Sequence, residues 1–375
     1  MENFEDTGKE AGNGRGKKDM GETRRKKRRK GKSGVMSALL CLFALGALTA
    51  CLVLWLQNRR LGLEAAEAAA FMETAYRQEE VEAMVEQAAE EAARQAALDK
   101  EEEILGEIRR WMEEGEGTSA MLRELYPDEI VVASEGRYHF FPITERLRHH
   151  SYVKEQFVLN EEDELEYWEA GQVVSRKGID VSKYQGEIDW EKVAADGVEY
   201  AFIRLGIRGY GEGKLILDDA YERNAEEALD SGLDVGVYFF TQAKNREEAV
   251  EEAEFVLEHV KNYDISYPVV LDVEEVAEDS ARTADMDKQA WTEVCIAFCE
   301  RIKEAGYTPM IYGNLKTFFL MLDMEQLEGY EKWFAYYRTP LYFPYEFSIW
   351  QYTSTGRVDG IKGDVDLNVS MKDWG

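Results

Sequence analysis

Pro268-Val-Val-Leu-Asp-Val-Glu274 is the stretch of sequence on which the fold of this chain depends. Its apolar residues run directly into an acidic end, a pattern that is typical of a strand buried on both faces of a parallel sheet. Side chains two residues apart on a strand point to the same face. The stretch therefore predicts a buried strand that presents Asp272 and Glu274 together at its carboxyl end.

The surrounding region, from residue 177 to residue 375, alternates strand-like and helix-like segments. Strands are expected at 178–182, 200–206, 234–241, 268–274, 308–314, 332–337, 347–352 and 364–369, and helices at 217–231, 245–263 and 285–305. Alternation of this kind predicts parallel pairing, and eight strands in about 200 residues predict a barrel. The expected fold class is α/β, an irregular (β/α) TIM-like barrel whose last three strands are joined by short links.

Four acidic residues are expected where strands of this barrel end, which is where catalytic side chains lie in such folds. Asp180 belongs to the first strand, Asp272 and Glu274 to the fourth, and Asp366 to the last. Residues two apart on a strand have Cα atoms roughly 6.6 Å apart, close to the carboxyl spacings that cleave glycosidic bonds. Packed acids also repel one another until one holds a proton at neutral pH. The alternative is that these acids are solvated or cap turns.

Aromatic residues occur on the same strands, and rings of this kind stack on sugar faces. Each ring could instead fill the barrel interior. The candidates for substrate binding are Tyr238, Phe240, Tyr312, Trp333, Tyr337, Trp350 and Tyr352.

The composition excludes several other classes of function. The chain has a net charge of −30, so its acidic body would repel a nucleic acid backbone, and no nucleic acid partner is expected. Four Cys and four His are scattered without the spacing of a zinc site or a catalytic triad. Neither a metal nor another cofactor is therefore expected.

The N-terminal region differs in charge from the rest of the chain. Residues 1–33 carry 12 Lys or Arg and 6 Asp or Glu and are expected to be a disordered tail. Val35 to Leu56 contains no charge, so residues 34–57 are expected to span a membrane. The basic block before them predicts a cytoplasmic N-terminus and an extracellular catalytic domain. Cleavage of this segment, or lipidation at Cys51, is the alternative.

Two segments separate the apolar run from the expected barrel. Residues 58–118 are rich in Ala, Glu, Gln and Arg, which predicts a helical stalk. The stalk has a weak apolar stripe, which leaves weak self-association as a coiled coil open. The alternative is that this segment is a partly disordered linker. Residues 119–176 are expected to form a small accessory α+β segment whose role is not evident from the sequence.

Several motifs taken together resemble glycoside hydrolase family 25, the Chalaropsis-type lysozymes and bacterial autolysins. They follow the order of the family over about 178–370 and consist of Gly178-Ile-Asp-Val-Ser-Lys-Tyr-Gln-Gly186, Leu271-Asp-Val-Glu274, Trp333-Phe-Ala-Tyr-Tyr337, Ile349-Trp-Gln-Tyr352 and Val365-Asp-Leu-Asn368. The resemblance implies an eight-stranded barrel and cleavage of the β-1,4 bond after N-acetylmuramic acid in the glycan strands of peptidoglycan.

The resemblance also assigns roles to the four acids. Glu274 would protonate the leaving oxygen, and Asp272 would orient the acetamido group of the substrate. Asp180 and Asp366 would line the floor of the substrate-binding groove and tune the pKa of Glu274. Direct attack by a carboxylate is an open alternative to participation of the acetamido group. Two other functions are also open, a catalytically inactive wall-binding module and an envelope scaffold.

Overall fold

The computed structural model describes residues 33–75, 78–115, 117–278 and 280–374. The chain divides into two compact units, Met1–Ile104 and Leu105–Gly375, and each is described by itself. The predicted basic tail at 1–33 lies, except for Ser33, outside the described residues.

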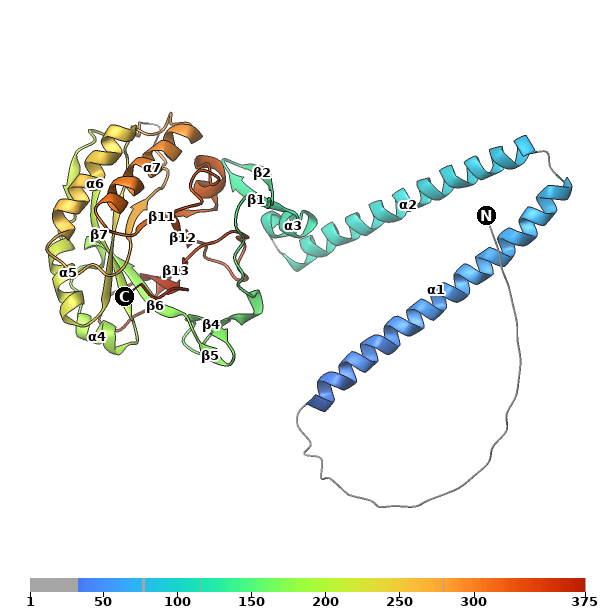
Figure 1. The fold of residues 1–375 in the computed structure, drawn as a ribbon, viewed down its shortest axis with the longest axis horizontal. Helices are drawn as coiled ribbons and strands as arrows, with labels where there is room; N and C mark the ends of the chain where they lie inside the picture. Colours follow the sequence, from blue (N-terminus) through green and yellow to red (C-terminus); the bar gives the residue numbers. More distant parts are fainter. Residues whose placement is uncertain (1–32, 76–77, 116, 279, 375) are drawn as a thin grey trace, which may run out of the picture. The chain divides into compact units, whose positions relative to one another are not determined.

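Two long helices account for the described part of the first unit. Helix α1 spans Ser33–Ala75 and contains the expected membrane segment, and α2 spans Gln78–Glu114 and continues into the second unit (Figure 1). In the part of the chain that the structure describes, no helix is long and apolar enough to cross a bilayer. Since the side chains of residues 34–44 lie outside that part, the span at 34–57 stays a prediction.

Helix α2 has the composition and the charge spacing of a solvated helix. Arg94 forms an ion pair with Glu91, at 2.6 Å, and Lys100 with Glu103, at 2.8 Å. Oppositely charged residues three or four apart stabilise an exposed helix slightly. Most of the expected stalk at 58–118 is thus helical, residues 58–75 in α1 and residues 78–114 in α2, and its self-association stays a prediction.

The second unit contains a closed barrel of eight strands. Hydrogen bonding runs around the ring in the order β6, β14, β13, β12, β11, β10, β9 and β7, and β7 pairs back with β6. The strands are β6 (Arg176–Val181), β7 (Tyr200–Arg208), β9 (Asp234–Phe240), β10 (Val269–Asp272), β11 (Pro309–Asn314), β12 (Glu331–Ala335), β13 (Ile349–Gly356) and β14 (Val365–Ser370). A short strand β8 (Leu215–Leu217) adds to the edge of β7. The expected closed α/β barrel is confirmed.

Helices cover the outside of the strands in the first half of the barrel, as Figure 1 shows for α5 (Tyr221–Asp230), α6 (Arg246–Val260) and α7 (Lys288–Glu304). The short helix α4 (Trp190–Ala195) was not predicted from the sequence. Gly232 and Gly306 follow α5 and α7 with φ of +80° and +92°. Glycine reaches this left-handed region without steric cost, which is why it ends helices so often.

The last strand departs from the expected pattern. Strand β14 pairs antiparallel with both β13 and β6, whereas the alternation of strands and helices predicted parallel pairing. The link from β13 to β14 is too short to carry a crossover helix, so the chain turns back as a hairpin.

Aromatic side chains fill the barrel interior. Tyr200 and Phe202 of β7 and Trp333 of β12 are among the inward-facing residues that form one buried cluster. The ring of Tyr200 lies over Gly178 on the neighbouring strand, where an added Cβ would be 2.1 Å from the ring. A glycine is therefore required at this position of β6, because the interior is packed to the density of a solid.

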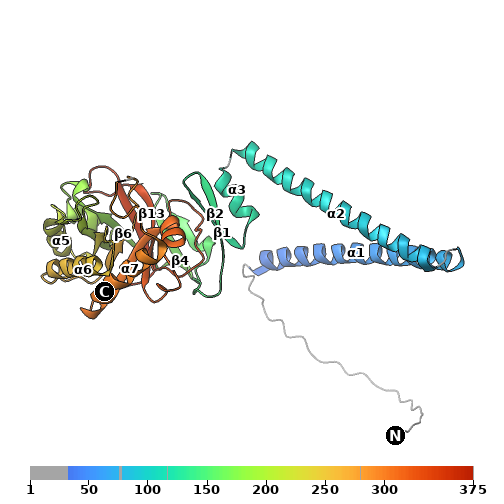
Figure 2. The same cartoon turned by 90° about the horizontal axis from the view of Figure 1, so that it is seen from above.

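The accessory segment forms one helix and two small antiparallel sheets. It comprises α3 (Thr118–Leu125), the hairpin β1 (Glu129–Ser134) and β2 (Arg137–Pro142), and the sheet β3 (Phe157–Leu159), β4 (Leu165–Glu169) and β5 (Gln172–Val173). Ile130 and Leu165 are buried in the same core cluster as the outer face of the barrel. The second view shows α3 and the β1–β2 hairpin beside the barrel (Figure 2).

Candidate active site

One cavity of about 320 Å³ opens where the parallel strands of the barrel end. All four acids singled out from the sequence line it: Asp180 of β6, Asp272 at the end of β10, Glu274 just beyond it, and Asp366 of β14. The sheet therefore brings together residues that are up to 186 positions apart in the chain. The closed ring makes this possible, because β14 hydrogen-bonds directly to β6.

The direction of β14 decides the position of Asp366. This residue lies near the start of its strand, not at the carboxyl end that the sequence analysis expected. Because β14 runs antiparallel to its neighbours, its amino end lies at the rim where the parallel strands finish. Asp366 is consequently the direct partner of Asp180 in the strand register.

Two buried amides hold the carboxylate of Asp180. The Nε2 atom of Gln351 and the Nδ2 atom of Asn368 each donate to its Oδ2 atom at 2.8 Å. Asn368 in turn accepts a hydrogen bond from the indole nitrogen of Trp333, at 2.8 Å. Gln351 accepts bonds from the hydroxyls of Tyr312 and Tyr337, at 2.8 and 2.7 Å. This network fixes both amides with their donors toward Asp180.

Asp272 and Glu274 occupy different environments on the same side of the cavity. Asp272 is 7% exposed, and its Oδ1 atom is buried without a hydrogen-bond partner in the described structure. Burial raises its pKa well above the ordinary value, and the neighbouring Glu274 and Asp180 raise it further, while Arg204 opposes the rise. Burial likewise raises the pKa of Glu274, against the effect of the Tyr312 hydroxyl.

The two remaining acids are shifted in the same direction. Burial and the nearby Asp366 raise the pKa of Asp180, although the amides of Asn368 and Gln351 oppose the shift. Burial also raises the pKa of Asp366, to about 6. Carboxyl groups that share one buried site cannot all ionise together, so the cavity retains protons at a pH where free carboxylates have lost them. In the described part of the chain, no group of three His, Cys, Asp or Glu side chains is arranged to hold a metal ion.

Five of the seven expected aromatic residues line the cavity. They are Tyr238, Phe240, Tyr312, Trp333 and Tyr337. Tyr337 is 50% exposed, whereas Trp333 is 1% exposed and stacks on Phe202 with ring centres 4.5 Å apart. Tyr337 is therefore accessible to a ligand in the cavity, and Trp333 supports the cavity floor.

The other two rings, Trp350 and Tyr352, lie outside this cavity. Side chains alternate along β13, so Ile349 and Gln351 point into the barrel, and Trp350 and Tyr352 point outward. Both are buried in the outer core, and the indole nitrogen of Trp350 donates to the carbonyl of Tyr336 at 2.7 Å. The structure thus gives these two rings a packing position instead of the expected substrate contact.

Comparison with known proteins identifies the family. The family model described as "Glycosyl hydrolases family 25" matches residues 179–361. The uncharacterized protein YegX of Escherichia coli strain K12 is 32% identical over 200 residues, which cover 51% of this chain and 68% of YegX. This chain belongs to glycosyl hydrolase family 25. The expectation of a glycoside hydrolase is thereby confirmed.

A lysozyme and an autolysin are also similar to this family 25 chain. Lysozyme M1 of Streptomyces globisporus is 28% identical over 206 residues, which cover 51% of this chain and 66% of that protein. The solved structure of the modular autolysin LytC of Streptococcus pneumoniae is 25% identical, with a TM-score of 0.48. That match covers 64% of this chain and 57% of LytC.

Several polar residues of this family 25 site were not predicted from the sequence. Arg204 on β7 faces the cavity, forms an ion pair with Asp218 at 2.6 Å, and lies under the ring of Tyr184, 4.9 Å from its centre. Tyr184 is 79% exposed at the rim. Gln351 and Asn368 stood inside motifs already noted, and their alternation with apolar neighbours was the available signal that they face inward.

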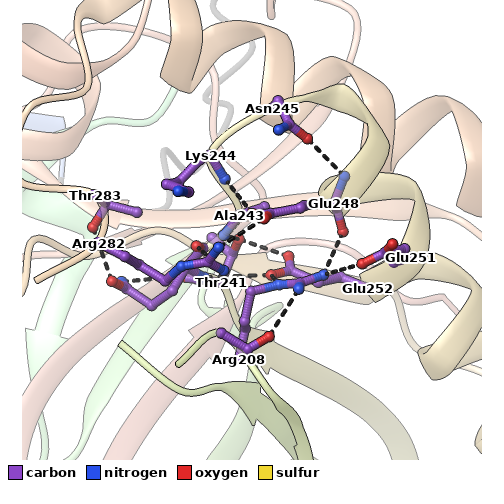
Figure 3. A network of polar contacts seen from close by, with 12 residues as sticks. Arg208, Thr241, Ala243, Lys244, Asn245, Glu248, Glu251, Glu252, Arg282 and Thr283 are labelled. Atoms are coloured by element: carbon purple, nitrogen blue, oxygen red, sulfur yellow. Dashed lines mark hydrogen bonds and ion pairs between the residues drawn. The ribbon is translucent and has the colours of Figure 1, made fainter. Parts of the chain in front are cut away.

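A buried polar network supports the family 25 cavity from behind. Arg208 at the end of β7 donates to Glu252 of α6 at 2.7 Å, and Figure 3 shows these side chains pointing toward one another. Glu252 accepts a hydrogen bond from the hydroxyl of Thr241 at 2.6 Å, and the backbone amide of Thr241 donates one to the carbonyl of Asp272 at 3.1 Å. The network therefore anchors the backbone that carries Asp272 to helix α6.

Proposed function

We propose that this family 25 protein cleaves the β-1,4 bond between N-acetylmuramic acid and N-acetylglucosamine in peptidoglycan. The observation that carries the proposal is the convergence of Asp180, Asp272, Glu274 and Asp366 in one aromatic-lined cavity. Cleavage of a glycosidic bond requires one protonated and one ionised carboxyl group close together, and buried acids with raised pKa values meet this need. The similarity to lysozyme M1 supports the same class of substrate.

Glu274 is the proposed general acid. Its raised pKa favours the protonated form, which can donate its proton to the glycosidic oxygen as the bond to the sugar carbon breaks. The ionised Glu274 then accepts a proton from the water that completes hydrolysis. Positioned proton transfer of this kind contributes about 10²- to 10⁴-fold to the rate.

Asp272 is the proposed partner of the acetamido group of the substrate. Its Oδ1 atom is buried and has no hydrogen-bond partner among the described residues, which costs free energy until a donor arrives. The N–H of an acetamido group would supply that donor and turn the acetamido oxygen toward the sugar carbon. Asp180 and Asp366 complete the floor of the cavity, and the carboxyl groups of the site that are ionised stabilise the developing cation.

The proposal is tested with Glu274→Gln in the full chain. We expect the release of reducing ends from peptidoglycan to fall about 10²- to 10⁴-fold, with an unchanged unfolding midpoint, because glutamine keeps the shape but has no proton to give. Glu278→Gln, an exposed neighbour, serves as the control and should retain activity. Unchanged turnover in Glu274→Gln would refute the assignment, and a wild-type chain that binds the wall without cutting it in a zymogram would favour the wall-binding alternative.

We further propose that the N-terminal helix anchors the enzyme in the cell membrane, with the catalytic unit outside. Support comes from the uncharged run of 22 residues from Val35 to Leu56 and the basic block before it. Between Leu45 and Leu63, α1 also exposes its apolar side chains. Protease treatment of intact wall-free cells should remove the barrel and leave the first residues protected, whereas release of the whole chain by salt would contradict the anchor.

A further inference from the structure

A second hollow, of about 540 Å³, opens beside the acid cavity. It shares Glu274, Tyr312 and Tyr337 with that cavity, so the two are continuous at the proposed general acid. Its other wall is formed by Ser119 and Arg123 of α3 and by Val132 and Ala133 of β1. We call it the α3–β1 groove. That wall lies outside residues 179–361, to which the family model matches.

Aromatic and polar contacts fix this wall to the barrel. Arg123 donates to the hydroxyl of Tyr336 at 2.5 Å, and its guanidinium lies 4.2 Å from the ring centre of Tyr342. The hydroxyl of Tyr342 accepts from the amide of Val131 at 2.8 Å and donates to the carbonyl of Glu129 at 3.1 Å. Strand β1 and the loop after β12 therefore form one surface in unit Leu105–Gly375.

The charge of the α3–β1 groove is opposite to that of the chain as a whole. Arg123, Lys316 and Arg338 line it, and Glu274 is its one acidic lining residue in the described part of the chain. Lys316 contacts Glu275. Arg123 contacts tyrosine rings, and among the described residues no carboxylate is paired with Arg338. Guanidinium groups without a carboxylate partner are the usual recognition elements for anionic ligands.

We infer that the α3–β1 groove binds the carboxylate-bearing peptide attached to the muramic acid of the substrate. The inference rests on the proposed function, because it needs a muramic acid in the acid cavity. A substituent on that sugar would leave the cavity beside Glu274, where the groove begins. Arg123 and Arg338 would pair with its free carboxylates, and the exposed Ala133 would contact its apolar side chains.

The test compares glycan strands that carry their peptides with the same strands after an amidase has removed them. The full chain, wild type or Arg123→Gln or Arg338→Gln, is assayed for kcat/KM by the release of reducing ends. Wild type should prefer the peptide-bearing strands, and each substitution should reduce that preference about tenfold, as expected for one hydrogen bond to a charged group. Arg137→Gln, an exposed position of the same hairpin outside the groove, should keep the wild-type preference.

Other results would contradict either this inference or the proposed function. If both variants keep the wild-type preference, or lose activity on both substrates alike, the groove does not read the peptide. If wild type releases no reducing ends from either substrate, the proposed function fails, and this inference fails with it. If the Arg123→Gln variant unfolds, the Arg338→Gln variant still tests the inference, because Arg338 lies on an exposed loop. If the substitutions reduce kcat/KM about tenfold on peptide-free strands that carry phosphate polymers, the groove binds phosphate and not the peptide.

Discussion

Asp180 illustrates how a carboxylate can be held in a site that already contains three others. Its Oδ2 atom accepts two amide hydrogen bonds, which favour its ionised form, while burial and Asp366 favour the neutral form. Glu274 has no such pair of amides, and burial is the main influence on it. The amides thus favour the ionised form at Asp180 and have no counterpart at Glu274, and such differences in environment can give neighbouring carboxyl groups different roles.

Asp366 gives a prediction about pH. Burial raises its pKa from the ordinary value to about 6. A carboxyl whose pKa is higher in the folded than in the unfolded state stabilises the fold fully below the unfolded pKa, and this contribution is lost as pH rises through the folded pKa. Asp366→Asn should therefore flatten the decline in the free energy of unfolding between about pH 4 and pH 7. Urea denaturation across this range measures the slope.

The control for this prediction is Asp364→Asn. Asp364 lies two residues away, is half exposed and pairs with Arg357 at 2.7 Å, so its exposed ion pair contributes little to stability. We expect the Asp364 variant to follow the wild-type slope. A slope for Asp366→Asn that matches wild type would show that this carboxyl titrates as it does in the unfolded chain.

At the scale of elements, strand β7 connects the active site with the helices outside. Arg204 on this strand faces the cavity, and Arg208 reaches α6 at the strand end. Arg208 is 4% exposed and Glu252 is fully buried. Burial raises the pKa of Glu252 to about 7 although Arg208 opposes this rise. Figure 3 shows the polar side chains that lie around this pair.

We expect Arg208→Met to destabilise the protein by about 3–5 kcal/mol at pH 8, because it leaves a buried carboxylate without its cation. The loss should be smaller at pH 5, where the carboxyl of Glu252 is neutral and needs no partner. Urea denaturation at both pH values measures the free energy of unfolding. Arg301→Met, which breaks an exposed ion pair with Glu254, is the control and should destabilise the protein far less, because solvent screens that pair. Equal losses for the two variants would contradict the importance of burial.

At the scale of the whole molecule, the accessory segment is part of the barrel's core. Phe157 packs edge-on against Trp350 with ring centres 5.2 Å apart, and the Tyr152 hydroxyl donates to the carbonyl of Phe347 at 3.1 Å. Ile130 and Leu165 are buried against the outer face of the barrel. The boundary near residue 176 that the sequence suggests therefore does not separate two independent cores.

A truncation tests this view. A fragment of residues 177–375 should be less stable than one of residues 105–375 by roughly 5 kcal/mol or more, since each lost buried apolar side chain contributes about 1.5–3 kcal/mol. It should also associate, because the rings around Trp350 become exposed. Thermal unfolding and size-exclusion chromatography compare the two fragments. Equal midpoints would show that the barrel is stable by itself.

Local patterns in the sequence were sufficient to predict much of the fold. The eight strands and the helices α5, α6 and α7 lie close to where hydrophobic runs and glycine caps placed them, because strand and helix formation depend on near neighbours. The residues Asp180, Asp272, Glu274 and Asp366 were identified for the same reason, since each belongs to a short motif next to an apolar run.

The remaining features depend on contacts between distant parts of the chain. Alternation in Ile349-Trp-Gln-Tyr352 shows which side chains share a face, but pairing with β12 and β14 decides which face turns inward. The antiparallel direction of β14, which brings Asp366 beside Asp180, also follows from that pairing. The α3–β1 wall beside Glu274 has no sequence signal, because it exists only once the accessory segment has packed on the barrel. The sequence by itself thus determined the strands, the helices and the four acids. The tertiary structure decided which way the side chains point and which residues they contact, because both depend on pairing between distant strands.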